Sequence, residues 1–295
     1  MSRPRRDGAF ARLTLLLPYG WLLLFLLVPF LIVVGVSLST KELGTPPFVP
    51  PVTFAGGVPR LAPDFGNYAY LLDDPLYVLA YLNSLKVALL STVACLLLGY
   101  PMAYGIVRAP ARWRPLLLTL VILPFWTSFL IRVYAWIGIL APNGILNNLL
   151  LGLGWIGEPL VLLSTEPAVI LGIVYSYLPF MILPLYATLE RLDPALMEAA
   201  ADLGCRPVAA FLRVTLPLSL PGMLAGSMLV FVPAVGEFVI PDLLGGTDTL
   251  MIGKVVWDEF FSNTDWPVAS AVATALLVVL ILPLLLLQRF QGRQP

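Results

Sequence analysis

The sequence predicts an all-α integral membrane protein with six transmembrane helices and both termini in the cytoplasm. The 295 residues are 59% hydrophobic and only 12% charged, which is typical of integral membrane proteins. Six stretches are long and apolar enough to cross a bilayer, and basic residues concentrate in alternate connections between them. A soluble all-α protein would need polar faces that these stretches lack.

Each predicted span exceeds the about 20 helical residues that cross roughly 30 Å of hydrocarbon. The first span follows a group of arginines but is longer than the core of a cleaved signal peptide. Prolines inside several spans suggest kinks that packed neighbours compensate, at Pro124, Pro179, Pro184 and Pro233. The spans are predicted at 13–38, 83–107, 115–140, 166–189, 215–240 and 268–288.

Lysine and arginine set the predicted orientation, because positively charged connections stay in the cytoplasm. With the N-terminus inside, only Lys41, Arg60 and Lys254 face outward, and Lys86 and Arg132 lie within spans. The basic residues that are then cytoplasmic are Arg3, Arg5, Arg6, Arg12, Arg108, Arg112, Arg114, Arg191, Arg206, Arg213, Arg289 and Arg293.

Acidic residues show the opposite bias. A negative outer mouth would attract cations, although the positive-inside rule itself explains part of the asymmetry. The acidic residues placed outside are Glu42, Asp64, Asp73, Asp74, Glu158, Glu166, Asp242, Asp248, Asp258, Glu259 and Asp265.

Residues 193–217 fit neither a span nor a loose loop. Asp193 can cap a helix N-terminus, and residues 195–201 are strong helix formers. Gly204 would end this arm, and Pro207 would begin a second short helix that leads into the fifth span. The stretch therefore predicts a helix-turn-helix elbow on the cytoplasmic side.

The first arm of this elbow carries an apolar face and an acidic pair. Glu198 and Asp202 lie four residues apart, where like charges cost an isolated helix about 0.2–0.5 kcal/mol. A basic partner would explain the pair, and a solvated loop helix explains it equally well. The apolar face, expected to rest on protein, consists of Leu196, Ala199, Ala200 and Leu203.

The sequence lacks residues that many catalytic sites need. It contains no histidine, and its two cysteines are Cys95 in a span and Cys205 in the elbow. A histidine-bearing triad, a Cys/His zinc site and a disulfide framework are therefore not expected. The net charge of zero argues against a strongly basic nucleic-acid binder.

A phosphate-binding loop is also missing. The one Gly-Lys pair, Gly253 and Lys254, is followed by Val255, and Asp248 occupies the position where the motif has glycine. The motif needs that glycine, and a Ser or Thr after the lysine to bind Mg²⁺. We therefore expect this chain to bind no cofactor of its own and not to hydrolyse ATP by that route.

Several polar and aromatic groups are candidates for a substrate path. A carboxylate at membrane depth, such as Glu237, costs a few kcal/mol unless it faces a cavity or a partner. Two interpretations stay open: a cavity-facing carboxylate for a cationic substrate, or an internal ion pair with Arg132 or Lys86. Aromatic side chains would add cation–π faces or simply mark the membrane interface. The candidates are Glu237, Asp242, Asp258, Glu259, Tyr134 and Trp136, with Trp126, Tyr175 and Tyr177 as further aromatic candidates.

The elbow resembles the permease motif of bacterial ABC importers. That pattern is Glu-Ala-Ala, three residues, Gly, nine residues, Ile, one residue, Leu-Pro. Glu198, Ala199 and Ala200 begin the match, Gly204 follows at the right spacing, and residues 214–217 end it with valine in place of isoleucine.

The resemblance extends over most of the chain and is closest to the polyamine branch, in particular to a putrescine permease subunit. The stretches that carry it are 98–101, 123–136, 178–181, 231–246 and 265–267. It implies a type I importer fold in the bacterial inner membrane. The implied partners are a second similar permease, two ATPase subunits that hold ATP and Mg²⁺, a periplasmic binding protein, a polyamine substrate and membrane lipid, but no nucleic acid.

The resemblance also implies roles along the chain. Residues 1–81 would form an N-terminal tail, an accessory span and a long periplasmic loop. Residues 82–288 would form the transport domain, and residues 289–295 a cytoplasmic tail. The elbow would be the coupling helix that docks on the ATPase, through Glu198, Ala199, Ala200, Asp202, Gly204, Leu216 and Pro217.

Other functions remain as alternatives. An ABC permease for another small solute, such as iron or another organic cation, is the first. An ion-coupled secondary transporter would work without an ATPase. A membrane enzyme is remote, because the acids are scattered and histidine is absent.

Overall fold

The computed structural model describes residues 8–55 and 58–291, and the chain divides into two compact units. The smaller unit contains residues 1–75 and 256–278, and the larger contains residues 76–255 and 279–295. Arg3, Arg5, Arg6 and Arg293, used above to orient the chain, lie outside the described residues.

The smaller unit begins with one long helical stretch, which includes a short π-helical segment, η1. The connection between α2 and α4 (Pro75–Arg108) then forms a helix, α3, and two antiparallel hairpins that were not predicted. The elements are α1 Gly8–Leu22, η1 Leu23–Leu27, α2 Val28–Ser37, β1 Thr40–Lys41, β2 Phe48–Val49, β3 Val52–Ala55, β4 Val58–Leu61 and α3 Gly66–Asp73.

Polar and aromatic contacts join the first hairpin to the start of α15 (Trp266–Gln291) within the smaller unit. Lys41 forms an ion pair with Asp265, with 2.9 Å between Nζ and Oδ2. Phe48 packs against Trp266 at 6.1 Å between ring centroids, and Phe260 stacks on the same indole at 4.9 Å. These contacts hold the first hairpin against the start of α15.

The larger unit is helical. Its elements up to the elbow are α4 Pro75–Arg108, α5 Arg114–Ile122, η2 Leu123–Trp126, α6 Phe129–Leu140, α7 Ile145–Gly152, α8 Glu166–Glu190 and α9 Ala195–Asp202. The remaining elements are α10 Pro207–Ala210, η3 Phe211–Thr215, α11 Leu216–Leu218, α12 Leu220–Val235, α13 Val239–Leu244, η4 Thr247–Thr249, α14 Ile252–Trp257 and η5 Asp258–Ser262, of which the last belongs to the smaller unit.

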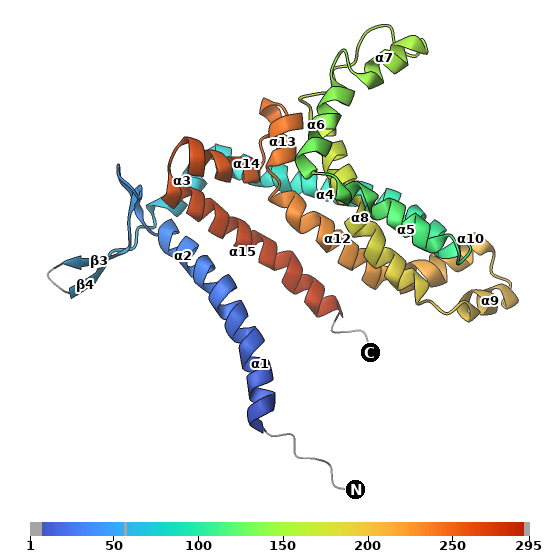
Figure 1. Ribbon diagram of the computed structural model, residues 1–295, viewed down its shortest axis with the longest axis horizontal. Helices are drawn as coiled ribbons and strands as arrows, with labels where there is room; N and C mark the ends of the chain where they lie inside the picture. Colours follow the sequence, from blue (N-terminus) through green and yellow to red (C-terminus); the bar gives the residue numbers. More distant parts are fainter. Residues whose placement is uncertain (1–7, 56–57, 292–295) are drawn as a thin grey trace. The chain divides into compact units, whose positions relative to one another are not determined.

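Helices α8 and α12 pack side by side in the larger unit, with α9 and α10 at one end of the pair and α13 at the other (Figure 1). Glycine allows this close approach, because a Cβ added at Gly226 would lie 2.8 Å from the sulfur of Met181. Met181, Ile182 and Leu185 of α8 are fully buried together with Val230 of α12 and form the core of this unit.

Four helices in the described part of the chain are long and apolar enough to cross a membrane: Leu16–Ser37, Pro75–Arg108, Phe129–Gly152 and Glu166–Glu190. A fifth is reached if the bent pair Pro207–Leu218 and Leu220–Val235 counts as one span. Arg114–Trp126 and Trp266–Ile281 are shorter apolar helices. The helical membrane architecture is therefore confirmed, whereas the structure does not establish a count of six.

The third predicted span, 115–140, is not one continuous helix. It is broken at Thr127 and Ser128, whose backbones are extended with ψ of 153° and 136°. Pro124 has no N–H to continue the α-helical pattern, and the chain changes there from α5 to the 3₁₀ helix η2, which ends at Trp126. The Pro124 carbonyl accepts a 2.8 Å hydrogen bond from the Thr127 hydroxyl, which closes the preceding 3₁₀ turn.

The fifth predicted span, 215–240, is interrupted twice. The axes on either side of Ser219 differ by 61°, and prolines at 217 and 221 flank the bend. Ser219 is buried and forms a 2.9 Å hydrogen bond with the hydroxyl of Tyr100 on α4. The helix then ends at Val235, so residues 236–238 form a non-helical break before α13.

Candidate functional site

The elbow folds as two helical arms around Gly204. The carboxylate of Asp193 accepts a 2.9 Å hydrogen bond from the Ala195 N–H at the start of α9. Gly204 has φ of +79°, a conformation that disfavours any residue with a Cβ. Its N–H bonds to the Ala201 carbonyl at 2.8 Å and the Cys205 N–H to the Ala200 carbonyl at 3.0 Å. This is the double hydrogen bond by which glycine terminates many helices.

The second arm runs from Pro207 to Leu218 without interruption and contains a π-helical turn at 211–215. Leu216 and Pro217 therefore lie at the end of this arm, just before the 61° bend. The motif residues thus connect the elbow directly to the bent start of α12.

The expectation that Leu196, Ala199, Ala200 and Leu203 rest together on apolar protein is wrong. Only Ala200 is buried, whereas Leu196 is 44% exposed and Leu203 is 85% exposed. α9 instead turns Met197 inward, where its sulfur accepts a 3.2 Å hydrogen bond from the Thr215 hydroxyl. The sequence misled because leucines on a short helix mark an apolar face without indicating what covers it.

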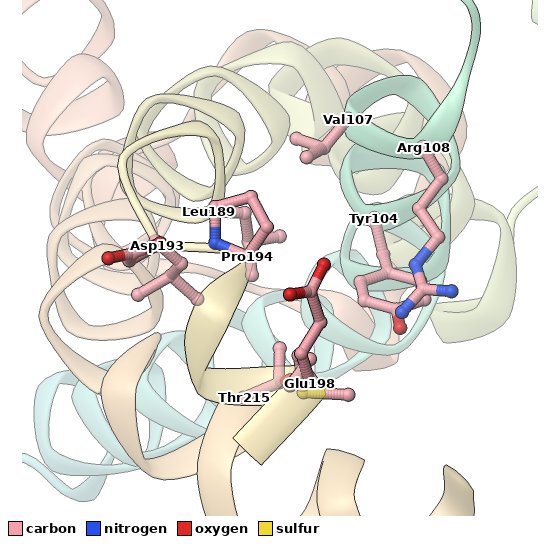
Figure 2. Close-up of a pocket in the computed structure, with 10 residues that line it drawn as sticks. Tyr104, Val107, Arg108, Leu189, Asp193, Pro194, Glu198 and Thr215 are labelled. Carbon is pink, nitrogen blue, oxygen red and sulfur yellow. The ribbon is translucent and has the colours of Figure 1, made fainter. Parts of the chain in front are cut away.

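A cavity of 330 Å³ lies between α9 and the ends of α4 and α8, and Glu198 lines it while Asp202 does not (Figure 2). Arg108 lines the same cavity and rests over the Tyr104 ring, 4.7 Å from its centroid. Among the described residues, no ion pair joins Glu198 to Arg108. The cavity residues are Tyr104, Val107, Arg108, Leu189, Leu192, Asp193, Pro194, Met197, Glu198 and Thr215.

A second cavity, of 630 Å³, lies where α6, α8 and the end of α12 meet. Its volume is within the about 300–1,000 Å³ range of small-molecule sites. The break at 127–128 and the break at 236–238 both contribute to its wall. It contains one carboxylate, one guanidinium and five aromatic rings, and its residues are Phe125, Thr127, Phe129, Arg132, Ser176, Tyr177, Phe180, Pro233, Gly236, Glu237, Phe238 and Val239.

Glu237 lies in the 236–238 break and is only 8% exposed. Its Oε2 accepts a 2.5 Å hydrogen bond from the Tyr177 hydroxyl. Its Oε1 accepts bonds from the backbone N–H groups of Val239, at 3.0 Å, and Ile240, at 3.4 Å. The alternative interpretation, an internal ion pair with Arg132 or Lys86, is not realised within the described residues, because Lys86 pairs with Glu166 at 2.6 Å and Arg132 binds a carbonyl.

Arg132 lies on α6 and lines the same cavity, but its partners differ from those of Glu237. Its Nη1 donates a 2.6 Å hydrogen bond to the Pro124 carbonyl. Its guanidinium carbon lies 5.0 Å from the Phe125 centroid and 5.9 Å from the Phe129 centroid. Its Nε is buried and has no hydrogen-bond partner among the residues that the structure describes.

The other candidates for the substrate path do not line this cavity. Asp242 forms a 3.0 Å ion pair with Lys254. Tyr134 is 58% exposed, and Trp136 packs edge-to-face on Tyr175 with 5.4 Å between centroids. Asp258 and Glu259 belong to the smaller unit, where Glu259 accepts a 3.0 Å hydrogen bond from Asn263.

The sequence did not predict that Arg132, Phe125 and Phe180 line this cavity. Arg132 was considered only as an ion-pair partner, although a lone arginine inside a span is itself a signal of a functional site. The sequence gives no signal for Arg108 as a neighbour of Glu198, since 90 residues of chain separate them. Within the described ranges, no group of three or more His, Cys, Asp or Glu side chains could hold a metal ion.

Comparison with known families gives a match over most of the chain. Residues 95–294 match the model of a family described as the binding-protein-dependent transport system inner membrane component. A spermidine/putrescine transport system permease protein, PotB, of Haemophilus influenzae is 43% identical over 94% of this chain and 92% of its own length. The protein of that name from Escherichia coli is 43% identical over 92% of this chain and 94% of its own length.

A more distant relative is the molybdenum transport system permease protein ModB of Mycobacterium bovis, 32% identical over 76% of this chain and 83% of its own. Among solved structures, a bacterial ABC transporter that imports alginate matches with a TM-score of 0.70 at 20% identity, over 98% of this chain and 96% of that one. The MetNI methionine ABC transporter matches with a TM-score of 0.56 at 17% identity, over 73% of this chain and 94% of that one. These similarities assign the fold to ABC importer permeases.

Proposed function

Because this chain belongs to the family of binding-protein-dependent transport system inner membrane components, we propose that it is the permease subunit of an ATP-driven polyamine importer. It is a transport component of the inner membrane rather than an enzyme. One observation carries the choice of substrate: the similarity to permeases named for spermidine and putrescine covers nearly the whole chain. Putrescine, spermidine or both are the proposed cargo.

The proposed topology has six spans with both termini in the cytoplasm. The two interrupted stretches, 115–140 and 215–240, each count as one span, and α15 is the sixth. Residues 82–288 then form the transport domain, and the segments 1–81 and 289–295 lie at its two ends. Support comes from the positive-inside distribution of arginine, which places α9 and α10 in the cytoplasm.

The elbow is proposed to dock on an ATPase subunit. Its solvent-facing side combines apolar and acidic groups: Leu203 is 85% exposed, Val208 is 70% exposed, and Leu212 is 53% exposed. Exposed apolar side chains on both arms are what a docking surface would need. The docking residues are then Glu198, Ala199, Ala200, Asp202 and Gly204, with Leu216 and Pro217 linking the elbow to α12.

The cavity around Glu237 is proposed as this subunit's part of the substrate path. Its carboxylate is positioned by Tyr177 and lacks a cationic partner among the described residues, so an amine of the substrate can supply that charge. Aromatic faces of the cavity favour cations by about 0.5–2 kcal/mol each. Asp242, Asp258, Glu259, Tyr134 and Trp136 remain predicted contributors nearer the outer mouth.

In the proposed cycle, closure of two ATPase subunits on ATP moves the elbow, and the elbow moves the bent α11–α12 segment. The second cavity opens toward a periplasmic binding protein, takes the polyamine, and releases it inside on reset. Glu198 and Arg108 line one cavity between α9 and α4, so elbow movement also changes their separation. The work comes from the higher affinity of ATP for the closed ATPase dimer.

The class of transporter is tested by co-purification and energy source. We expect the chain to co-purify with ATPase subunits and a second permease, and the reconstituted complex to need ATP and a binding protein for uptake. Uptake that persists without ATP and stops when ion gradients are collapsed would identify an ion-coupled transporter instead.

A permease for another small solute is the second candidate. A permease named for molybdenum transport is also similar to this chain, so its relatives include permeases named for a solute other than a polyamine. The cavity contains both a carboxylate and a guanidinium, so its net charge does not choose between a cation and an anion. Competition between labelled putrescine and other solutes in the reconstituted complex separates the two candidates.

A further inference from the structure

Arg132 and Glu237 bring opposite charges into one cavity without neutralising each other. Both line the 630 Å³ space, yet Glu237 is bonded to Tyr177 and to backbone N–H groups, and Arg132 to a backbone carbonyl. An arginine is an unexpected neighbour in a cavity proposed to bind a polycation, because like charges repel. Substrate binding alone does not account for Arg132 in this cavity.

Resting on the function proposed above, we propose that Arg132 is the internal competitor of the substrate for Glu237. In the state seen here Arg132 is held aside by Pro124 and two phenylalanines, and Glu237 is available to an amine. During reset Arg132 leaves Pro124, pairs with the carboxylate and displaces the amine. It is a positioning residue for release and contributes nothing to capture.

The tether of Arg132 crosses a helix break, which couples it to movement. Arg132 lies on α6, whereas Pro124 lies in η2 on the other side of the extended residues Thr127 and Ser128. A change of angle at 127–128 therefore changes the 2.6 Å contact between Nη1 and the Pro124 carbonyl. Movement between α5 and α6 thereby holds or frees the guanidinium.

Arg132 has one unsatisfied hydrogen-bond donor in its present position. Its Nε is buried and finds no partner in the described part of the chain, and a buried unpaired donor carries a desolvation cost. A planar guanidinium can bind a carboxylate through two parallel hydrogen bonds. The paired arrangement therefore gains a contact that the present one lacks, while the present one keeps Pro124 and both aromatic faces. Two such alternatives form a switch that helix movement can bias.

The test is single-turnover release of labelled putrescine from the complete complex in nanodiscs, with both permeases, the ATPase subunits and the loaded binding protein. The complex is trapped with label in the membrane cavity, and release is followed on reset. We expect Arg132→Gln to slow release at least about fivefold, the lower end of typical coupling between sites, while the amount of label captured stays equal or rises. Arg132→Lys keeps the charge and is expected to release faster than Arg132→Gln.

Lys86→Gln is the matched control, because Lys86 is a cation of the same unit that pairs with Glu166 outside the cavity. It is expected to release at the parent rate. Stimulation of ATP hydrolysis by the binding protein verifies that each variant is assembled. If Arg132→Gln does not assemble, Arg132→Lys decides, since lysine cannot make the two-bond pair and is expected to release measurably more slowly than the parent.

Glu237→Gln separates the two proposals. If it captures as much label as the parent, the function proposed for the cavity is wrong, and the competitor role fails with it. If it captures less label, the cavity function stands, and Arg132→Gln decides the inference. Release at the parent rate, or capture that falls with Arg132→Gln, would then overturn the competitor role, because falling capture would make Arg132 a binding residue.

Discussion

The hydroxyl of Tyr177 donates a 2.5 Å hydrogen bond to Oε2 of Glu237, joining α8 to the break between α12 and α13. This bond and the two backbone N–H groups fix a carboxylate that is only 8% exposed. A carboxylate oriented in this way is ready to receive a cation without further ordering.

Removing the Tyr177 hydroxyl is expected to weaken substrate capture without unfolding the protein. A hydrogen bond to a charged group contributes about 1.5–3 kcal/mol, so Tyr177→Phe should lower capture of labelled putrescine by about tenfold. Tyr175→Phe, on the same helix and packed against Trp136, is the control and should capture normally. Equal capture by both variants would mean that Tyr177 does not orient the binding carboxylate.

Neutralising Glu237 is expected to have the larger effect. Glu237→Gln keeps the shape but removes the charge that an ammonium group would meet, so uptake at low putrescine should fall by more than tenfold. Glu158→Gln, at an exposed carboxylate in the connection between α7 and α8, should leave uptake unchanged. Uptake by Glu237→Gln at the parent rate across the concentration range would remove this residue from the substrate path.

Placing a charge on the exposed side of the elbow should disrupt its docking. Leu203 is 85% exposed, so Leu203→Asp should leave the thermal stability of the isolated subunit near that of the parent while reducing ATPase co-purification several-fold. Val161→Asp, at a side chain that is 77% exposed in the 153–165 connection, is the control. Charge reversal at Glu198 and Asp202 should act in the same direction, and unchanged assembly in all of these variants would contradict docking at the elbow.

The turn of the elbow depends on its glycine. Gly204 has φ of +79°, so Gly204→Ala forces a Cβ into a strained conformation and should destabilise the elbow by about 1–2 kcal/mol. We expect partial uncoupling, measured as fewer putrescine molecules transported per ATP hydrolysed. Gly105→Ala, inside α4 with open space around its position, should preserve coupling.

Composition and the length of the apolar stretches predicted the membrane class, and the glycine and proline positions predicted the Gly204 turn and the second arm that follows it. These features succeed because they depend on local physics, namely apolar length and the backbone freedom of glycine. The break at Thr127 and Ser128 was predicted only as a kink at Pro124, because the tolerance of a span for proline depends on its neighbours. Pro179 and Pro184, in contrast, lie within α8 without interrupting it.

The cavity was less predictable than the elbow. Glu237 stood out as a charge in an apolar run, but its partners come from α8 and the start of α13 rather than from either basic residue of the alternative interpretation. Arg108 and Glu198 meet only through tertiary folding. A face of leucines on α9 signalled exposure to a partner as readily as packing within the chain, and the sequence alone does not separate the two.

Import of polyamines is tested most directly by uptake of labelled putrescine into proteoliposomes that contain the complete complex with its binding protein. We predict uptake that requires ATP, that excess unlabelled putrescine or spermidine suppresses, and that molybdate or iron leaves unchanged. ATP-driven uptake of molybdate or iron by the same complex, with no uptake of putrescine or spermidine, would contradict the proposed function.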